Sequence, residues 1–192
     1  MNLTRLTEPS RLPVSLAEAK RHCRVEFSDD DLEIKTLIEA ATDYLDGPTG
    51  VLGRAIVSQE WALDLPAWPE DFMLPVEPVS GVAITYWDEA GVERELAADS
   101  FNLASWPSNR TLFSWLDGFQ KPLLDISRTN PVRVVITAGF GGPDAVPSGL
   151  KVAINMLVAH WYLNREAVAK ASSMAELPLA VSALLSRWRV HL

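Results

Sequence analysis

One segment near the C-terminus, residues 150–161, constrains the fold more than any other. Apolar residues recur along it at helical spacing and form one continuous stripe: Leu150, Ala153, Ile154, Leu157, Val158 and Trp161. Val152, Met156 and Ala159 add apolar surface on other sides of the same helix. A helix that is apolar nearly all round is buried, so we expect it to be central, with several neighbours packed against it. Its apolar run is too short to span a bilayer, and no membrane contact is expected.

Two helices are predicted in the N-terminal part of the chain. Ser15 and Glu18 have the spacing of a capping box, in which each side chain bonds the backbone of the other. Residues 29–31 are three aspartates, whose negative charge favours the start of a second helix. Apolar residues follow at helical spacing up to Leu45, and the turn-forming residues 47–50 end that helix.

The region from about residue 54 to residue 138 is rich in predicted strands. Residues 57–65 alternate between apolar and polar, which indicates a strand with one buried face. Residues 82–87 and 92–96 form a predicted hairpin, in which Gly91 supplies a positive φ. Short strands are expected at 101–103 and 111–113, and a clear one at 131–138.

These segments predict an α+β protein with a helical core built from both ends of the chain and an inserted antiparallel β-rich region. The predicted parts are 1–53 (N-terminal helical part), 54–138 (β-rich insertion) and 139–192 (C-terminal helical part with a docking tail). Within the last part, residues 169–176 are small and polar and are expected to form a flexible joint. A second helix follows Pro178, with Val181, Leu184, Leu185 and Trp188 on one face.

Charge and cysteine content exclude several classes of protein. The formal net charge is -8 over 192 residues, which argues against a sequence-reading DNA-binding protein, because such proteins present a basic face. The single cysteine, Cys23, excludes an intrachain disulfide and fits a reducing cytoplasm. The N-terminal residues do not have the pattern of a secretory signal peptide.

Candidate catalytic and metal-binding residues are few, and each has a simpler explanation. Ser148 lacks the strained turn of a serine nucleophile, and His22 and Cys23 are adjacent helix residues that do not face each other. Residues 29–31 lack the spacing of a calcium loop, and the glycine-rich residues 139–142 lack the lysine of a phosphate loop. We therefore expect no catalytic residue, no cofactor and no metal.

Two clusters of aromatic and charged residues are better candidates for protein contacts, because aromatic residues and Arg dominate interface hot spots. Trp161, Tyr162, Arg165 and Glu166 lie at the end of the central helix, where helix-end packing and a subunit interface are both possible. The segment 187–189, with Trp188 between two arginines, ends the C-terminal helix. Docked within its own chain it is a lid, and docked on another protein it is an anchor.

The order of several packing and turn signatures resembles the tailed-phage head–tail connector (adaptor) family, often described as gp6-like, which includes the adaptors of gene transfer agents. The resemblance runs over nearly the whole chain. The matching segments are 13–20, 24–25, 29–31, 37–41, 49–50, 54–56, 59–61, 74–75, 78–79, 132–134, 137–141, 147, 161–166, 177–178, 184–185 and 189–190.

The resemblance implies a structural role in a phage or gene transfer agent particle. Such adaptors assemble in the host cytoplasm into a ring, usually dodecameric, beneath the portal protein at the head–tail junction. The ring extends the DNA channel without sequence-specific binding and offers a platform to stopper and tail proteins. The helical core would build the ring, and the β-rich insertion would face outward or towards the tail proteins. In relatives, the C-terminal segment inserts into the portal. Carried onto this sequence, the portal-binding residues are Leu184, Leu185, Arg187, Trp188, Arg189, Val190 and Leu192.

A second hypothesis stays open. The β-rich region is also compatible with a glycan-binding module or a hydrolase of a phage particle, with the helices as its scaffold. That hypothesis predicts a concave site holding a carboxyl group whose pKa is raised.

Overall fold

The computed structural model describes residues 2–107, 109–164 and 179–190, and it divides into two compact units. The β unit comprises Met1–Pro9 and Ser58–Gly139, and the helical unit comprises Ser10–Val57 and Phe140–Leu192. Four α-helices and two antiparallel sheets make up the described residues, so the predicted α+β class is confirmed.

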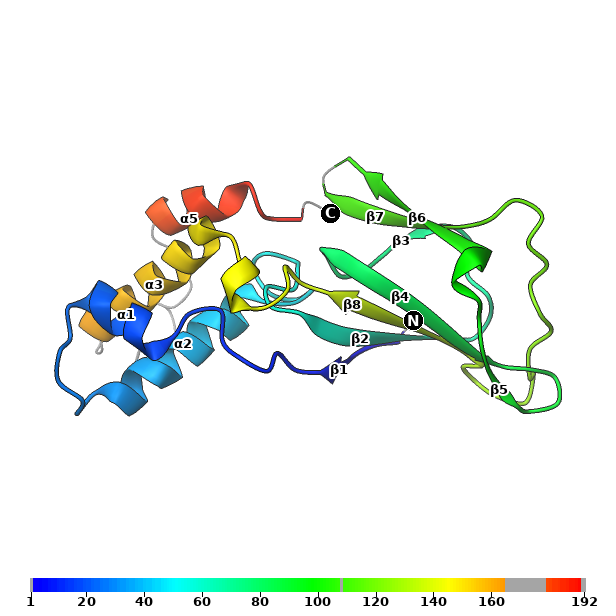
Figure 1. Cartoon of the computed structure of the whole chain (residues 1–192), viewed down its shortest axis with the longest axis horizontal. Helices are drawn as coiled ribbons and strands as arrows, with labels where there is room; N and C mark the ends of the chain where they lie inside the picture. Colours follow the sequence, from blue (N-terminus) through cyan, green and yellow to red (C-terminus); the bar gives the residue numbers. More distant parts are fainter. Residues whose placement is uncertain (1, 108, 165–178, 191–192) are drawn as a thin grey trace. The chain divides into compact units, whose positions relative to one another are not determined.

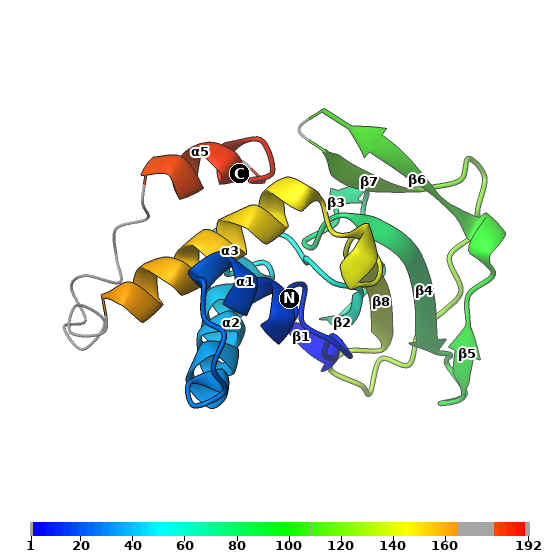
Figure 2. The ribbon, with the colours of Figure 1, turned by 60° about the vertical axis from the view of Figure 1, so that its left-hand side comes forward.

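The helical unit is built around one central helix. Its helices are α1 (Leu16–Cys23), α2 (Asp31–Leu45), α3 (Ser148–Leu163) and α5 (Leu179–Ser186), with a 3-10 turn, η2 (Pro143–Ala145), before α3. α3 contacts the three other helices, and Figures 1 and 2 both show it between α5 and the α1–α2 pair. Its predicted stripe is buried: Leu150, Ala153, Ile154, Leu157, Val158 and Trp161. The central position predicted for this helix is confirmed.

The predicted capping box at the start of α1 is present. The Glu18 backbone N–H donates to Ser15 Oγ at 3.2 Å, and the Ser15 backbone N–H donates to Glu18 Oε2 at 2.7 Å. The Ser15 hydroxyl also donates to the same carboxylate oxygen at 2.7 Å. These bonds satisfy backbone donors that a helix start otherwise leaves without partners.

The chain turns sharply after α2 because of one glycine. A Cβ atom at Gly50 would lie 2.2 Å from the Asp46 carbonyl oxygen, so no larger residue fits there. Asp46 is buried, and its carboxylate accepts a hydrogen bond of 2.7 Å from the Ile56 backbone N–H. The turn and this hydrogen bond hold the last part of the N-terminal helical segment, which includes the buried Leu52, before the chain continues into the β unit.

The β unit contains two antiparallel sheets. The larger has the order β1 (Asn2–Thr7), β2 (Gln59–Leu65), β8 (Val132–Ala138), β4 (Val79–Trp87), β5 (Glu93–Glu95). The smaller has the order β3 (Phe72–Met73), β7 (Arg110–Trp115), β6 (Phe101–Trp106), and a 3-10 turn, η1 (Ala98–Ser100), precedes β6. The predicted hairpin is β4–β5, with Gly91 at φ 72°. The last predicted strand, β8, is central, because β2 and β4 pair with its two edges.

Aromatic side chains fill much of the β unit. Phe113 is fully buried, and its ring lies 5.1 Å from both Phe101 and Trp115 and 5.3 Å from Phe72. These edge-to-face and tilted contacts are the arrangements that aromatic rings prefer. Trp115 in turn stacks on Phe119 at 5.3 Å, which fixes the connection that follows β7.

The first residues of the chain correct the sequence analysis. Residues 1–53 were assigned to the helical part, whereas Asn2–Thr7 form β1 and pair with β2 in the β unit. Leu3 and Arg5 are half-buried, and the Arg5 guanidinium lies 4.8 Å from the centre of the Trp61 ring. Such a short edge strand has little hydrophobic pattern of its own, because its partner strand supplies the stabilising contacts.

Candidate docking site

The C-terminal helix lies against its own helical unit. α5 contacts α3, and Val181 and Leu185 are fully buried in the core of that unit. Leu184 is half-buried beside them, whereas Leu179 on the opposite side is 90% exposed. Figures 1 and 2 both show α5 alongside α3. The apolar face predicted for this segment is therefore occupied within the chain. Pro178 lies outside the described residues.

Trp188 follows the last turn of α5 and packs against a loop of the same unit. Its backbone N–H donates to the Leu185 carbonyl oxygen at 2.9 Å. Its ring meets Phe140 edge to face, with 5.6 Å between centroids and an interplanar angle of 89°. A Cβ atom at Gly149 would lie 3.7 Å from Trp188 Nε1, so the start of α3 also passes close to the indole. Trp188 is a half-buried anchor within the chain.

The two arginines beside Trp188 differ in their surroundings. Arg187 is exposed, and its guanidinium lies 4.8 Å from the centre of the Trp188 ring, within cation–π range. Arg189 is half-buried, and its Nε is buried with no hydrogen-bond partner among the described residues. A buried donor without a partner costs about 1–3 kcal/mol. Arg189 therefore has a donor to offer if the segment moves to another partner.

The end of the described chain is bonded to the turn after α2. The Val190 backbone N–H donates to the Leu52 carbonyl oxygen at 2.9 Å. The Val190 Cβ lies 3.4 Å from the position that a Cβ at Gly53 would occupy. Residues 179–190, called the tail below, thus have three attachments to the helical unit: α5 on α3, Trp188 on Phe140 and Val190 on Leu52. Leu192, the last predicted portal-binding residue, lies outside the described residues.

Two of the four predicted subunit-interface residues, Trp161 and Tyr162, lie at the end of α3. Trp161 is 5% exposed and meets Tyr44 edge to face at 6.3 Å, so it packs within the chain. Tyr162 is half-buried, and its hydroxyl donates to the Asp30 carboxylate at the start of α2. Arg165 and Glu166 lie outside the described residues, and the subunit-interface assignment stays a prediction.

The residues weighed as catalytic, phosphate-binding or metal-binding candidates lie at helix starts, against the core or in turns. Ser148 begins α3, and the Cys23 thiol is half-buried, where desolvation raises its pKa. Asp31 forms an ion pair with Lys20 at the start of α2. Gly139 and Gly141 have φ of 125° and 107°, as a tight turn requires. In the described part of the chain, no three His, Cys, Asp or Glu side chains gather closely enough to hold a metal ion.

Sequence reasoning missed the surface that receives the tail. Phe140 was treated as part of a glycine-rich turn, yet its ring is the one that Trp188 contacts. The one sequence signal for this surface is an aromatic residue between two glycines. A turn does not require a large apolar side chain, so such a residue indicates a packing contact. Leu52 takes part through its backbone carbonyl, which leaves no trace in the sequence.

The described residues include no helix of the length and apolarity that crossing a membrane demands.

Comparisons with known proteins agree with this architecture. Residues 13–78 match the family model described as phage gp6-like head-tail connector protein. A chain from the neck of an empty gene transfer agent particle, computed with C6 symmetry, matches with a TM-score of 0.78 and 27% identity. A chain from the virion of a native gene transfer agent particle matches with a TM-score of 0.76 and 28% identity. Each match covers 100% of this chain and 97% of the other.

A third chain, from the neck of a native particle computed with C12 symmetry, matches with a TM-score of 0.69 and 27% identity. No curated protein matches the chain. The resemblance inferred from the sequence is confirmed: the chain is similar to the gp6-like head–tail connectors over residues 13–78 and shares the fold of gene transfer agent neck chains over its whole length.

Proposed function

We propose that this chain is a structural head–tail adaptor, which forms a ring in the neck of a tailed phage or a gene transfer agent particle. The observation that carries the proposal is the match over the full chain length, at 27–28% identity, to three chains from gene transfer agent particles, two of them from the neck. The C6 and C12 symmetries of two of those particles support an oligomeric ring at the head–tail junction. The role is that of a connector rather than of an enzyme.

The tail is the proposed contact with the portal protein. Its predicted contact residues include Leu185, which is fully buried, and Trp188, which is half-buried against Phe140. Leu185 cannot reach another protein while the tail lies on its own helical unit, and Trp188 offers only the part of its ring that Phe140 leaves exposed. Portal binding through the full set of predicted residues therefore requires the tail to leave that unit, which would also give the buried Arg189 Nε a new partner.

The charge of the chain fits a channel that lets DNA pass. With a net charge of -8, a ring of such chains makes few phosphate contacts, so DNA slides along it without sequence-specific binding. The proposal also includes a dodecameric ring. Its further partners are stopper and tail proteins, and the β unit faces them.

The alternative of a glycan-binding module or a hydrolase gains no support from the carboxyl groups. It requires an acid whose pKa is raised. In the β unit, hydrogen bonds from the Val92 backbone and the Arg94 side chain lower the pKa of Asp88. Hydrogen bonds from the Ser127 hydroxyl and backbone likewise lower the pKa of Asp125.

Co-sedimentation with the portal protein encoded beside this chain tests the proposal. We expect the full-length chain to pellet with portal rings, and a chain that ends at Glu176 to remain in the supernatant. The truncated chain must first show the circular dichroism of a folded protein, because α5 contributes to the core. If the truncated chain binds as well as the full-length chain, the portal contact lies elsewhere on the molecule. If neither form binds, the adaptor proposal is wrong.

A further inference from the structure

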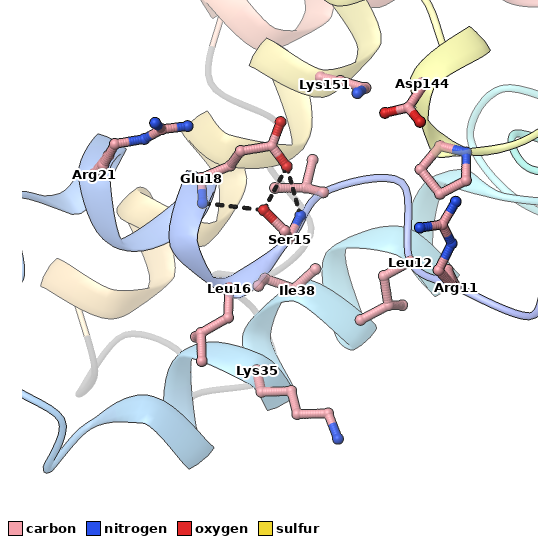
Figure 3. Close-up of a pocket in the computed structure, with 12 residues that line it drawn as sticks. Arg11, Leu12, Ser15, Leu16, Glu18, Arg21, Lys35, Ile38, Asp144 and Lys151 are labelled. Atoms are coloured by element: carbon pink, nitrogen blue, oxygen red, sulfur yellow. Dashed lines mark hydrogen bonds between the residues drawn. The ribbon is translucent and has the colours of Figure 1, made fainter.

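A cavity of about 590 Å³ opens on the helical unit between α1, α2 and the start of α3 (Figure 3). Its floor is apolar: Val14 and Ile38 are buried, and Leu12 and Leu16 are half-buried. Its rim carries four cations, Arg11, Arg21, Lys35 and Lys151, against two carboxylates, Glu18 and Asp144. A basic rim is unusual for a chain whose net charge is -8.

The cations of this rim have few close partners within the described part of the chain, and Arg21 and Lys151 act on Glu18 through their charge alone. Glu18 is engaged by Ser15 in the capping box. Lys35 has a long contact of 3.9 Å with Glu39 on the exposed face of α2, a pair of little energetic value. In the described part of the chain, Arg11, Arg21 and Lys151 have no carboxylate close enough for an ion pair. The cavity is therefore suited to an occupant that is both apolar and acidic.

The connection between α1 and α2 has that chemistry. Phe27 is 54% exposed and Leu32 is 78% exposed, and the acidic residues Glu26 and Asp29 beside them are exposed too. We call residues 26–32 the acidic corner. It is held in place because Lys20 Nζ donates to the Phe27 carbonyl oxygen at 2.7 Å and pairs with Asp31. A fixed segment loses little conformational entropy when it binds.

None of the residues that line the cavity belongs to the acidic corner. One copy of the chain can therefore use the two surfaces in two separate contacts. We propose that the acidic corner of one copy docks into the α1–α2 cavity of the next. Phe27 and Leu32 then lie against the apolar floor, and Glu26 and Asp29 approach the basic rim, which gives complementary charge across the contact. A contact between two different surfaces of identical chains is heterologous, and such contacts form a ring when the rotation from copy to copy closes on itself. The inference rests on the proposed ring and names the surfaces that build it.

A disulfide between two different copies tests the contact. In a Cys23→Ser background, one preparation carries Phe27→Cys and a second carries Leu12→Cys or Leu16→Cys. The two are mixed on portal rings and oxidised, so that a heterodisulfide joins separate copies. We expect at least tenfold more of it than with Ala17→Cys, an exposed α1 residue that does not line the cavity, because a disulfide forms only where the two Cβ atoms point towards each other.

Each outcome is decisive. Rings that assemble but give no more cross-link at residues 12 and 16 than at residue 17 overturn the inference and leave the adaptor function standing. A cavity cysteine that links to the portal protein, identified by mass spectrometry, assigns the cavity to a different occupant and also overturns it. If the unmodified chain forms no ring on the portal under electron microscopy, the proposed function fails, and the inference fails with it.

Discussion

At the scale of single residues, the pair Ser15 and Glu18 shows how two side chains determine where a helix begins. The hydroxyl and the backbone N–H of Ser15 donate to the Glu18 carboxylate and hold its pKa below the ordinary value of 4.5, and the charges of Lys151 and Arg21 act in the same direction. The ionised carboxylate is the form that accepts these bonds. That ionisation therefore stabilises the start of α1, which borders the cavity.

Replacing Ser15 tests the capping box. We expect Ser15→Ala to lower the free energy of unfolding of the helical unit by about 1 kcal/mol, because the Glu18 backbone N–H loses its acceptor. Urea denaturation followed by circular dichroism measures the change. Ser10→Ala, at an exposed position of the same unit, is the matched control and should change the stability by much less. Equal effects of the two substitutions would contradict the capping role.

The capping box also predicts a pH dependence. Because folding lowers the pKa of Glu18, the carboxylate stabilises the folded state fully above the unfolded pKa of about 4.5, and this contribution is lost as the pH falls through the lower folded value. Glu18→Gln should therefore destabilise the protein near neutral pH, and its difference from the unmodified chain should shrink as the pH falls below 4.5. Urea titrations at a series of pH values measure that difference, and a constant difference across the series would argue against ionisation as the cause.

At the scale of elements, the tail is the segment whose position bears most directly on function. Its helix, its tryptophan and its last described residue each have a separate attachment to the helical unit. The same residues are the proposed contacts with the portal protein. Attachment to the helical unit and binding to the portal protein compete for the same tail residues. The strength of the attachment within the chain therefore determines how readily an adaptor binds its portal.

A disulfide between residues 53 and 190 would hold the tail in place. The Cβ positions lie 3.4 Å apart, close to the 3.5–4.5 Å typical of disulfides. We expect oxidised Gly53→Cys/Val190→Cys, in a Cys23→Ser background, to lose portal binding in the co-sedimentation assay, because the tail cannot leave. The reduced form of the same protein is the control and should bind, even though a side chain at φ 64° adds some strain. Undiminished binding by the oxidised form would mean that the tail stays on its own unit in the assembled state.

At the scale of the whole molecule, the helical unit bears both proposed assembly contacts, the tail and the cavity with its acidic corner. The β unit has a core of its own around Phe113 and β8. A substitution in the tail should therefore leave the β unit folded and still prevent completion of the particle. This separates a failure of assembly from a failure of folding.

Trp188 and Phe140 form a matched pair for that test. Trp188→Ala removes the aromatic anchor both from the tail on its own helical unit and from the tail bound to the portal protein. Phe140→Ala removes only the partner of Trp188 within the chain. We expect each to cost the helical unit about 1–2 kcal/mol, since each loses part of a buried ring contact. Trp188→Ala should abolish tailed, infectious or gene-transferring particles, and Phe140→Ala should preserve them. If Trp188→Ala still gives functional particles, or if both variants fail equally, the anchor assignment is wrong.

Much of this architecture follows from the sequence, because it depends on neighbours along the chain. The apolar period of residues 150–161 predicts a central helix, since a helix repeats every 3.6 residues and this one has apolar residues on nearly all sides. The capping box and the hairpin turn at Gly91 follow from bonds and dihedral angles that span a few residues. The α+β class and the resemblance to head–tail connectors arise from the order of such local signals.

The tertiary structure alone decided the rest, because it depends on contacts between residues far apart in the chain. β1 exists through its pairing with β2, some sixty residues later, so its own sequence predicts little. The tail is docked because Phe140 and the Leu52 carbonyl oxygen meet Trp188 and Val190 in space. The cavity exists because the packing of α1, α2 and α3 brings four cations around an apolar floor. No spacing of residues along the sequence predicts that arrangement.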